Sequence, residues 1–341
     1  MKNINLSVDG GGTSLRIIAF DYELNFIAQS KSGAVNPNFE DIGKIGENIS
    51  EAAKILLINL SKLGENIKIK NIYAAIVGSA EYFKRIFMKE AGELAEEANF
   101  YGISEGLSHI YSASLRDKGG AALAGTGSGA VYCNKNVMIH LGGYGIPVGD
   151  EGSGAWIGLH GMSAAVKYIN GWGEKTLLTE KLYEYLNIDT PNLITSLLYR
   201  KNINQRGLFA GFCPYVAECE RIGDKTAKSI IYAAGRDMGL QMISVLKKAE
   251  CKNMTDITAE SPVIYASGGA WKGTPYMLEA MRETIRGAYP DAVCTHGLFD
   301  PVMGGVIKFI FDRTGKDTVS IEDEEHLKKE FGDYLFKFDE F

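Results

Sequence analysis

A run of three glycines after a short apolar stretch constrains the fold of this chain more than any other feature. The residues read Leu6-Ser-Val-Asp9-Gly10-Gly11-Gly12-Thr13. Glycine lets the backbone turn tightly and bring its N–H groups against an anion, and a nearby carboxylate such as Asp9 can bind a divalent cation. The following residues, 15–21, are of β type without a helical period. The pattern therefore predicts a phosphate-binding turn that joins two strands of a hairpin.

A similar turn, Ala124-Gly-Thr-Gly-Ser128, occurs about a third of the chain later and also lies between two strand-like stretches. The sequence contains no P-loop, because its two Gly-Lys pairs, at Gly43 and Gly315, are followed by Ile45 and Asp317 rather than by Ser or Thr. A dinucleotide-binding fingerprint is excluded as well, because that motif needs a helix after its glycines. What remains is a duplicated glycine hairpin.

Size and composition narrow the class of protein further. At 341 residues the chain exceeds the length at which one core usually stops growing, so two domains are expected. The net charge of -6 argues against a nucleic-acid partner, and no apolar run resembles a signal peptide or approaches the ~20 residues that span a bilayer. Five scattered cysteines without a C-x-x-C pair indicate neither disulfides nor a metal cluster. We expect a cytoplasmic protein with no membrane or nucleic-acid partner.

The order of strand-like and helical segments repeats once along the chain. The first part has expected strands at 3–9, 15–21, 26–32, 69–77 and 99–103, and expected helices at 42–63, 83–97 and 105–115. The second has strands at 121–125, 130–134 and 137–141, a helical block over 154–251, a strand at 263–267, a helix at 272–286, a strand at 292–295 and a helix at 302–311. The acidic last thirty residues are expected to form a surface helix. We expect an N-terminal domain over 1–117, with 302–341 packing back on it, and a C-terminal domain with a helical insertion over 118–301.

This layout resembles the sugar kinase, Hsp70 and actin superfamily of ATPases, and more narrowly the N-acetylglucosamine kinase (BadF/BadG) family. The segments that carry the resemblance are Asp9-Gly-Gly-Gly-Thr13, Asn36, Ala124-Gly-Thr-Gly-Ser128, Gly142-Gly-Tyr-Gly145, Gly149-Asp-Glu-Gly-Ser153 with Trp156-Ile157, Phe209-Ala-Gly-Phe-Cys213 and Ser267-Gly-Gly-Ala-Trp271. The resemblance implies an α/β fold of two ribonuclease-H-like domains, a duplicated βββαβαβα, with an ATP cleft between them. It also implies a homodimer.

The resemblance assigns ATP and Mg²⁺ to the glycine turns. It implies that the two turns bind the β- and γ-phosphates and that Asp9 lies near magnesium, which suits phosphoryl transfer because that reaction needs positioning and charge neutralisation. The implied nucleotide-binding residues are Gly11, Gly12, Thr13, Gly125, Thr126, Gly127, Ala210, Gly268 and Gly269, of which Gly268, Gly269 and Ala210 lie against the adenosine.

The same resemblance implies a small-molecule sugar substrate. The sugar-binding positions are Asn36, Glu105, Ser128, Gly143, Tyr144, Gly145 and Asp150, and Ser128 also belongs to the second phosphate turn. An amide and a carboxylate together donate to and accept from ring hydroxyls. Tyr144 stands where the family frequently has Trp. The implied reaction is ATP-dependent phosphorylation of an N-acetylated amino sugar, with N-acetylglucosamine as the first substrate and N-acetylmuramic acid as the second.

One position departs from the family pattern. The resembled family places an Asp catalytic base at the start of the helix after the fourth or fifth strand, and here Glu105 occupies that position after Ser104. Reference pKa values of the two carboxyls barely differ, but one extra methylene moves the carboxylate by about an ångström, which can cost roughly a hundredfold in rate. The hypothesis is a pocket reshaped around Glu105 as the base; its structural alternative is a carboxylate that merely favours a helix N-terminus.

Other functions remain as alternatives. A non-catalytic sugar sensor is compatible with the change at Glu105. An activator ATPase for a radical dehydratase resembles the family too, but it needs closely spaced cysteines to bridge a cluster. A sugar-responsive regulator would carry a basic helix-turn-helix.

Overall fold

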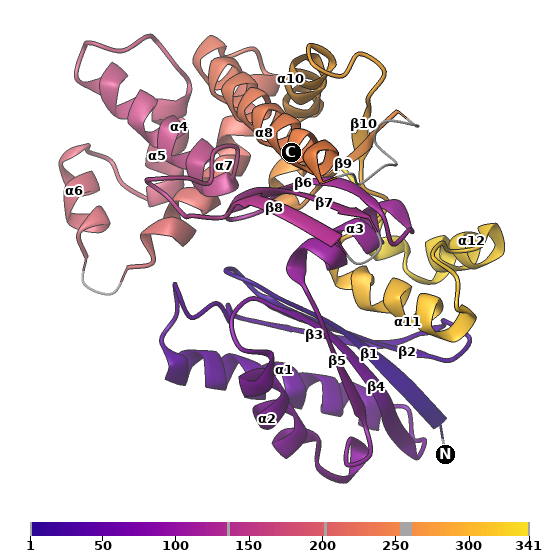
Figure 1. Ribbon diagram of the computed structural model, residues 1–341. Helices are drawn as coiled ribbons and strands as arrows, with labels where there is room; N and C mark the ends of the chain where they lie inside the picture. The colour runs from indigo at the N-terminus through magenta and orange to yellow at the C-terminus, as the bar shows by residue number, and fades with distance from the viewer. Residues whose placement is uncertain (1, 135–136, 201–202, 253–260, 340–341) are drawn as a thin grey trace. The chain divides into compact units, whose positions relative to one another are not determined.

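The computed structural model describes residues 2–134, 137–200, 203–252 and 261–339 and has an α/β fold (Figure 1). The chain forms two compact units. The first comprises Met1–Lys118 and Gly297–Phe336, and the second comprises Gly119–His296 and Lys337–Phe341. The expected division instead has all of 302–341 packing on the first domain.

The first unit contains a mixed sheet of five strands. They are β1 (Lys2–Gly10), β2 (Leu15–Asp21), β3 (Phe26–Ser32), β4 (Ile67–Ile76) and β5 (Asn99–Ile103). The spatial order is β3-β2-β1-β4-β5, with antiparallel pairing of β1 to β2 and β2 to β3 and parallel pairing of β1 to β4 and β4 to β5. Asp9 and Arg16 are opposite each other in the β1–β2 ladder, so both side chains point to one face of the sheet.

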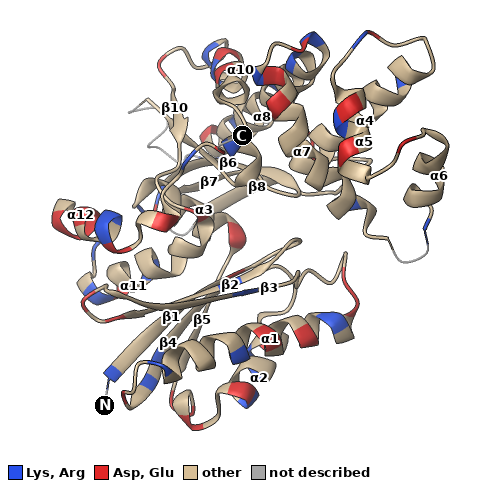
Figure 2. Cartoon of the chain, turned by 180° about the vertical axis from the view of Figure 1, so that it is seen from behind, with Lys and Arg blue, Asp and Glu red and all other residues tan. Residues whose placement is uncertain are grey.

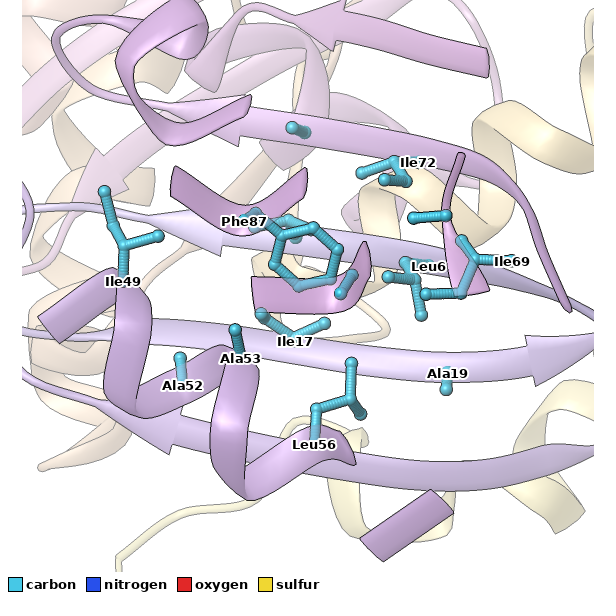
Figure 3. Close-up of a cluster of buried hydrophobic side chains, with 14 of the residues drawn as sticks. Leu6, Ile17, Ala19, Ile49, Ala52, Ala53, Leu56, Ile69, Ile72 and Phe87 are labelled. Carbon is cyan, nitrogen blue, oxygen red and sulfur yellow. The ribbon is translucent and has the colours of Figure 1, made fainter. Parts of the chain in front are cut away.

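Helices cover both faces of this sheet. They are α1 (Ile42–Ser61), α2 (Ala80–Ala91), η1 (Gly92–Leu94), α3 (Glu105–Ser114), η3 (Pro301–Met303), α11 (Gly304–Thr314), α12 (Ile321–Glu330) and η4 (Gly332–Tyr334). Along β2 the side chains alternate: Ile17 and Ala19 enter a core with α1 and α2, whereas Ile18 and Phe20 enter one with α3 and α11. Figure 3 shows the first of these cores, where Phe87 from α2 and Leu56 from α1 lie over the strands.

Two expectations for this unit are wrong in detail. The helix expected over 83–97 begins earlier, at Ala80, and ends at Ala91, because Gly92 adopts a φ of 52° and a 3₁₀ turn follows. The acidic tail does form a helix, α12, but it is more than a surface feature. Leu327 and Phe331 are fully buried and belong to the core with α3 and α11.

The second unit repeats the same sheet topology. Its strands are β6 (Gly119–Ala124), β7 (Ser128–Asn134), β8 (Val137–Gly142), β9 (Val263–Ser267) and β10 (Val293–His296). Their order is β10-β9-β6-β7-β8, and the antiparallel and parallel pairings match those of the first sheet, strand for strand. The duplicated hairpin and the ribonuclease-H-like architecture are confirmed.

The helical insertion of the second unit follows β8. Its helices are α4 (Gly154–Ile169), α5 (Leu178–Leu186), α6 (Asn192–Leu198), α7 (Gln205–Arg221) and α8 (Lys225–Cys251), and η2 (Gly269–Lys272) and α10 (Pro275–Arg286) come after β9. Gly158 lets α4 approach α7 closely, because a Cβ there would lie 1.8 Å from the Phe209 carbonyl oxygen. Trp271 is fully buried and donates to the Ala122 carbonyl at 3.0 Å, so it packs in the core of this unit.

Charged residues of both signs lie on the helices. Figure 2 shows acidic and basic residues interspersed along helices such as α1 and α12. Among the described residues, no helix combines the length and the apolar character needed to cross a membrane.

Candidate active site

The glycine turn of the first unit is tied to the loop that carries Asn36. Gly11 donates to the Ser14 carbonyl at 3.1 Å, and its own carbonyl accepts from Val35 at 3.0 Å. The next residue, Asn36, is buried, and its side-chain oxygen accepts from the Asn38 N–H at 2.9 Å. The structure thereby brings Asn36 next to the turn that contains Gly12 and the exposed Thr13.

Three carboxylates gather on the sheet face beside this turn. Asp9 comes from β1, Glu105 is the first residue of α3, and Asp300 precedes η3. Burial is the main cause that raises the pKa of Asp9 to about 7, and the negative charges of Glu105 and Asp300 also raise it. Arg16 opposes the increase and forms an ion pair with Asp300 at 3.3 Å. We define this carboxylate cluster as Asp9, Glu105 and Asp300, in which the two neighbouring charges oppose the ionisation of Asp9.

Glu105 is held at the N-terminus of α3. The Ser104 side chain caps the helix by accepting from the Leu107 N–H at 3.3 Å, which fixes where the helix begins. Glu105 is exposed, and its charge acts on Asp9. The expected helix and cap are therefore present, and they place a solvent-accessible carboxylate near the glycine turn.

In the second unit, the second glycine turn and the segment 149–155 form one hydrogen-bonded cluster. Gly125 donates to the Gly127 carbonyl at 2.9 Å and accepts from the Gly154 N–H at 2.8 Å. The Ser128 hydroxyl donates to the Glu151 carbonyl at 2.7 Å, and the Ala155 N–H donates to the Thr126 carbonyl at 3.4 Å. The predicted phosphate turn and the predicted sugar-binding segment are thus neighbours.

Asp150 is the buried carboxylate of this cluster. It is 1% exposed and adopts a φ of 64°, a left-handed conformation that Asp tolerates better than most residues. One carboxylate oxygen accepts from the Gly145 N–H at 3.1 Å, which joins Asp150 to the loop 143–145. The other accepts from Arg206 at 2.6 Å. In that loop Gly143 is exposed, and the Tyr144 side chain is 83% exposed.

Gly268 lies against the end of β6. Its φ is 113°, and a Cβ there would be 2.5 Å from the Ala124 carbonyl oxygen, so only glycine fits. Gly269 begins the 3₁₀ turn η2, and Ala210 lies half-buried in α7. The structure therefore brings Gly268 next to Gly125.

Three charged residues of these sites were missed by the sequence analysis. Arg16 and Asp300 pair across 284 positions, and Arg206 reaches Asp150 across 56. Arg16 carried a usable signal, since it follows the glycine turn within a strand. Asp300 and Arg206 lie outside every motif, and no local pattern marks them.

Metal binding by the protein alone has little support. Within the described ranges, no group of three His, Cys, Asp or Glu side chains is arranged to hold a metal ion. Mg²⁺ usually keeps one or two protein carboxylates and takes its other ligands from phosphates and water. The Asp9 side chain is a carboxylate of the kind that this donor set requires.

The two sheets share one topology, with a glycine turn in the first hairpin of each unit, and solved structures described as sugar kinases share this ribonuclease-H-like fold. Residues 6–307 match the BadF/BadG/BcrA/BcrD ATPase family, and the chain belongs to this family. The expected family is thereby confirmed.

Two curated relatives and a solved structure extend the comparison. An N-acetylmuramic acid/N-acetylglucosamine kinase from Clostridium acetobutylicum is 23% identical over 318 residues, covering 89% of this chain and 96% of the relative. An N-acetyl-D-glucosamine kinase from Dictyostelium discoideum is 26% identical over 320 residues, covering 90% and 97%. The structure of a candidate N-acetylglucosamine kinase from Chromobacterium violaceum has a TM-score of 0.64 at 20% identity, covering 90% of this chain and 98% of that one. At this identity the structural likeness shows a shared fold.

Proposed function

We propose that this protein is an ATP-dependent kinase that phosphorylates a hydroxyl group of an N-acetylated amino sugar. The observation that carries the proposal is the carboxylate cluster beside the first glycine turn, where Glu105 is near enough to Asp9 to raise its pKa. Family membership and the two relatives named as amino-sugar kinases support it.

The nucleotide is assigned to residues of both units. Backbone N–H groups of the two turns bind phosphate, and the segment around Gly268 contacts the adenosine together with Ala210. These nucleotide-binding residues are Gly11, Gly12, Thr13, Gly125, Thr126, Gly127, Ala210, Gly268 and Gly269. Asp9 would hold Mg²⁺, which neutralises charge on the phosphates.

The sugar is assigned to Asn36, Ser128, Gly143, Tyr144, Gly145 and Asp150, with Glu105 as the base. Asn36 and Asp150 are buried polar groups of the kind that recognise hydroxyl and amide groups. Glu105 accepts the proton of the attacking hydroxyl while the oxygen bonds to the γ-phosphorus and the bond from that phosphorus to ADP breaks. N-acetylglucosamine is the first candidate and N-acetylmuramic acid the second.

The cysteines disfavour the alternative of an activator ATPase. All five are free thiols, and Cys133, Cys213, Cys219 and Cys294 are buried. Burial raises the pKa of Cys213 and of Cys219 to about 12, which opposes the thiolate form that binds a cluster. The homodimer and the cytoplasmic location stay predictions.

A coupled assay of ADP release tests the proposal. Purified protein with Mg-ATP is offered N-acetylglucosamine, N-acetylmuramic acid, glucosamine and glucose in turn. Sugar-dependent ADP release, greatest with an N-acetylated sugar, supports the kinase. Hydrolysis independent of sugar would indicate an activator ATPase, and sugar binding without turnover would indicate a sensor; either result contradicts the proposal.

A further inference from the structure

We propose that Arg206 is a positioning residue for the sugar: its guanidinium fixes the Asp150 carboxylate in the orientation that accepts hydrogen bonds from sugar hydroxyls. The inference rests on the proposed function and adds to it a residue that lies outside the sequence motifs. All the groups involved belong to the second unit.

The pair is short and well removed from water. Arg206 Nη2 donates to Asp150 Oδ2 at 2.6 Å, and the two side chains are 14% and 0% exposed, respectively. A buried carboxylate is costly unless it is paired and hydrogen-bonded. Arg206 therefore compensates the charge of Asp150, and removing the guanidinium would leave that charge buried without its ionic partner.

The two oxygens of Asp150 have different anchors. Oδ1 accepts from the Gly145 N–H at 3.1 Å, and Oδ2 accepts from Arg206. A carboxylate offers about four lone-pair directions, so two anchors set its plane and leave acceptor capacity for a ligand. The backbone of Asp150 is in the left-handed region, at a φ of 64°, a conformation that persists where its surroundings hold it. Arg206 supplies one of these two constraints.

The ion pair also lies directly on the second glycine turn. A Cβ built on Gly127 would be 2.0 Å from Arg206 Nη2 and 2.7 Å from Asp150 Oδ2. Any larger residue at Gly127 would displace the guanidinium or the carboxylate. Glycine at this position therefore serves a second purpose besides the close approach to phosphate, because it leaves room for the ion pair between Arg206 and Asp150.

Helix α7 positions the Arg206 guanidinium next to Asp150 and Gly127. Asn204 caps the helix by accepting from the Gly207 N–H at 2.8 Å, so Arg206 lies in the first turn. Ala210 is four residues further on and lies on the same face of the helix. One helix face therefore carries both Arg206 and the residue assigned to the adenosine.

A direct role of Arg206 in binding phosphate is the competing explanation, because Gly127 belongs to the phosphate turn. The two roles differ in which ligand, sugar or nucleotide, binds more weakly when Arg206 is replaced. A residue that acts through Asp150 affects the sugar, and its effect vanishes once Asp150 can no longer be ionised. A phosphate ligand affects the nucleotide regardless of Asp150.

The test compares Arg206→Gln, Arg206→Lys, Asp150→Asn and the Arg206→Gln/Asp150→Asn double variant with wild type. Arg221→Gln, at the other end of α7, is the matched control for loss of a guanidinium. Binding of N-acetylglucosamine is measured by calorimetry, and KM for sugar, KM for ATP and kcat are measured by ADP release. Near-UV circular dichroism checks that each variant is folded, and Arg206→Lys provides the folded comparison if Arg206→Gln is not.

We expect Arg206→Gln to weaken sugar binding by roughly 10- to 100-fold, as truncating one partner of a buried charge pair commonly does. We expect KM for ATP to change by less than about twofold and Arg206→Lys to recover part of the lost sugar affinity. In the double variant, the losses of sugar affinity from the two single substitutions are not expected to multiply. A raised KM for ATP with unchanged sugar affinity, or losses that multiply, overturns the inference. If wild type neither binds nor phosphorylates N-acetylglucosamine or N-acetylmuramic acid, the proposed function itself is wrong, and the inference falls with it.

Discussion

The side chain at the start of α3 is one methylene longer than the Asp that stands at this place in the resembled family, which makes its reach a testable property. Glu105→Gln keeps shape and removes the base, so we expect kcat to fall by roughly 10²- to 10⁴-fold with little change in KM for the sugar. Steady-state ADP release with N-acetylglucosamine measures both constants. Glu81→Gln, in the first turn of α2, is the control for loss of a carboxylate near a helix N-terminus.

Glu105→Asp tests the reach itself. In a pocket shaped for Glu105, the shorter side chain misplaces the carboxylate by about an ångström, and we expect kcat to fall by roughly 10- to 100-fold. The same assay applies. A variant faster than wild type would mean that the pocket is built for Asp, and full activity of Glu105→Gln would remove Glu105 from catalysis.

Asp9 makes the stability of the ligand-free protein depend on pH. Its pKa is about 7 in the folded protein against an ordinary value of 3.8, chiefly because of burial. Between these two values the folded state holds a proton that the unfolded state releases, so this contribution to stability declines as pH rises and is lost above about 7. Asp9→Asn removes the free-energy cost of ionising this buried carboxyl group in the folded protein. We expect it to stabilise the protein by about 1–4 kcal/mol at pH 8 and by much less at pH 4.5.

Chemical denaturation of wild type and Asp9→Asn at the two pH values, without nucleotide or metal, measures this difference. Asp291→Asn, on an exposed loop between α10 and β10, is the control. If Asp9→Asn raises the free energy of unfolding equally at both pH values, or more at the acidic one, the expected ionisation of Asp9 is contradicted.

At this scale the sequence identifies residues that lie within motifs. Asp9 precedes a glycine and Glu105 begins a helix, so their neighbours mark them as candidates, whereas Asn36 is a candidate only through the family resemblance. Arg206 and Asp300 could not be predicted, because each acquires its role from a partner far along the chain, Asp150 for one and Arg16 for the other. An ion pair across 56 or 284 positions depends on the completed fold.

Among the elements, the pairing of α4 with α7 positions the candidate sugar site of the second unit. Alanine usually stabilises a helix relative to glycine by roughly 0.5–1 kcal/mol. At Gly158 the sign is reversed, because a Cβ there would overlap the Phe209 carbonyl, a backbone atom that cannot move without shifting α7. We expect Gly158→Ala to destabilise the protein by about 1–3 kcal/mol.

Thermal unfolding of Gly158→Ala measures that loss, with Ser163→Ala on the exposed side of α4 as control. Because α7 carries Arg206, the variant is also expected to bind N-acetylglucosamine more weakly. A melting temperature equal to or above that of wild type would show that the two helices separate without cost.

The periodicity of apolar residues predicts well which segments form helices and strands. The strands of both hairpins and α1 follow from alternation or from a 3.6-residue period within single segments. The ends of these elements and the depth of their burial have other causes. The helix after β4 stops at Gly92 through its backbone conformation, and Leu327 and Phe331 enter a core although their segment reads as acidic surface. Burial of an amphipathic helix depends on the surface that it meets.

At the scale of the molecule, the proposed function assigns residues from two units of the same topology to its two substrates. The residues assigned to phosphate and sugar come from both, with Gly11 and Glu105 in the first unit and Gly125 and Asp150 in the second. Under this proposal, the first ligand to bind reduces the conformational freedom of the protein, so the second ligand has less freedom left to remove. The two substrates are therefore expected to bind with positive coupling.

We expect a non-hydrolysable ATP analogue with an imido bridge to tighten binding of N-acetylglucosamine by about 5-fold or more, within the usual range for coupling between sites. By linkage, saturating sugar must tighten binding of the analogue by the same factor. Calorimetric titration of each ligand with and without the other measures both factors. Adenosine is the matched control: the proposal assigns it to Gly268 and Ala210, both in the second unit, and it lacks the phosphates assigned to the two glycine turns. We expect adenosine to leave sugar affinity unchanged; equal sugar affinity with and without the imido analogue would mean that the two units bind their ligands independently.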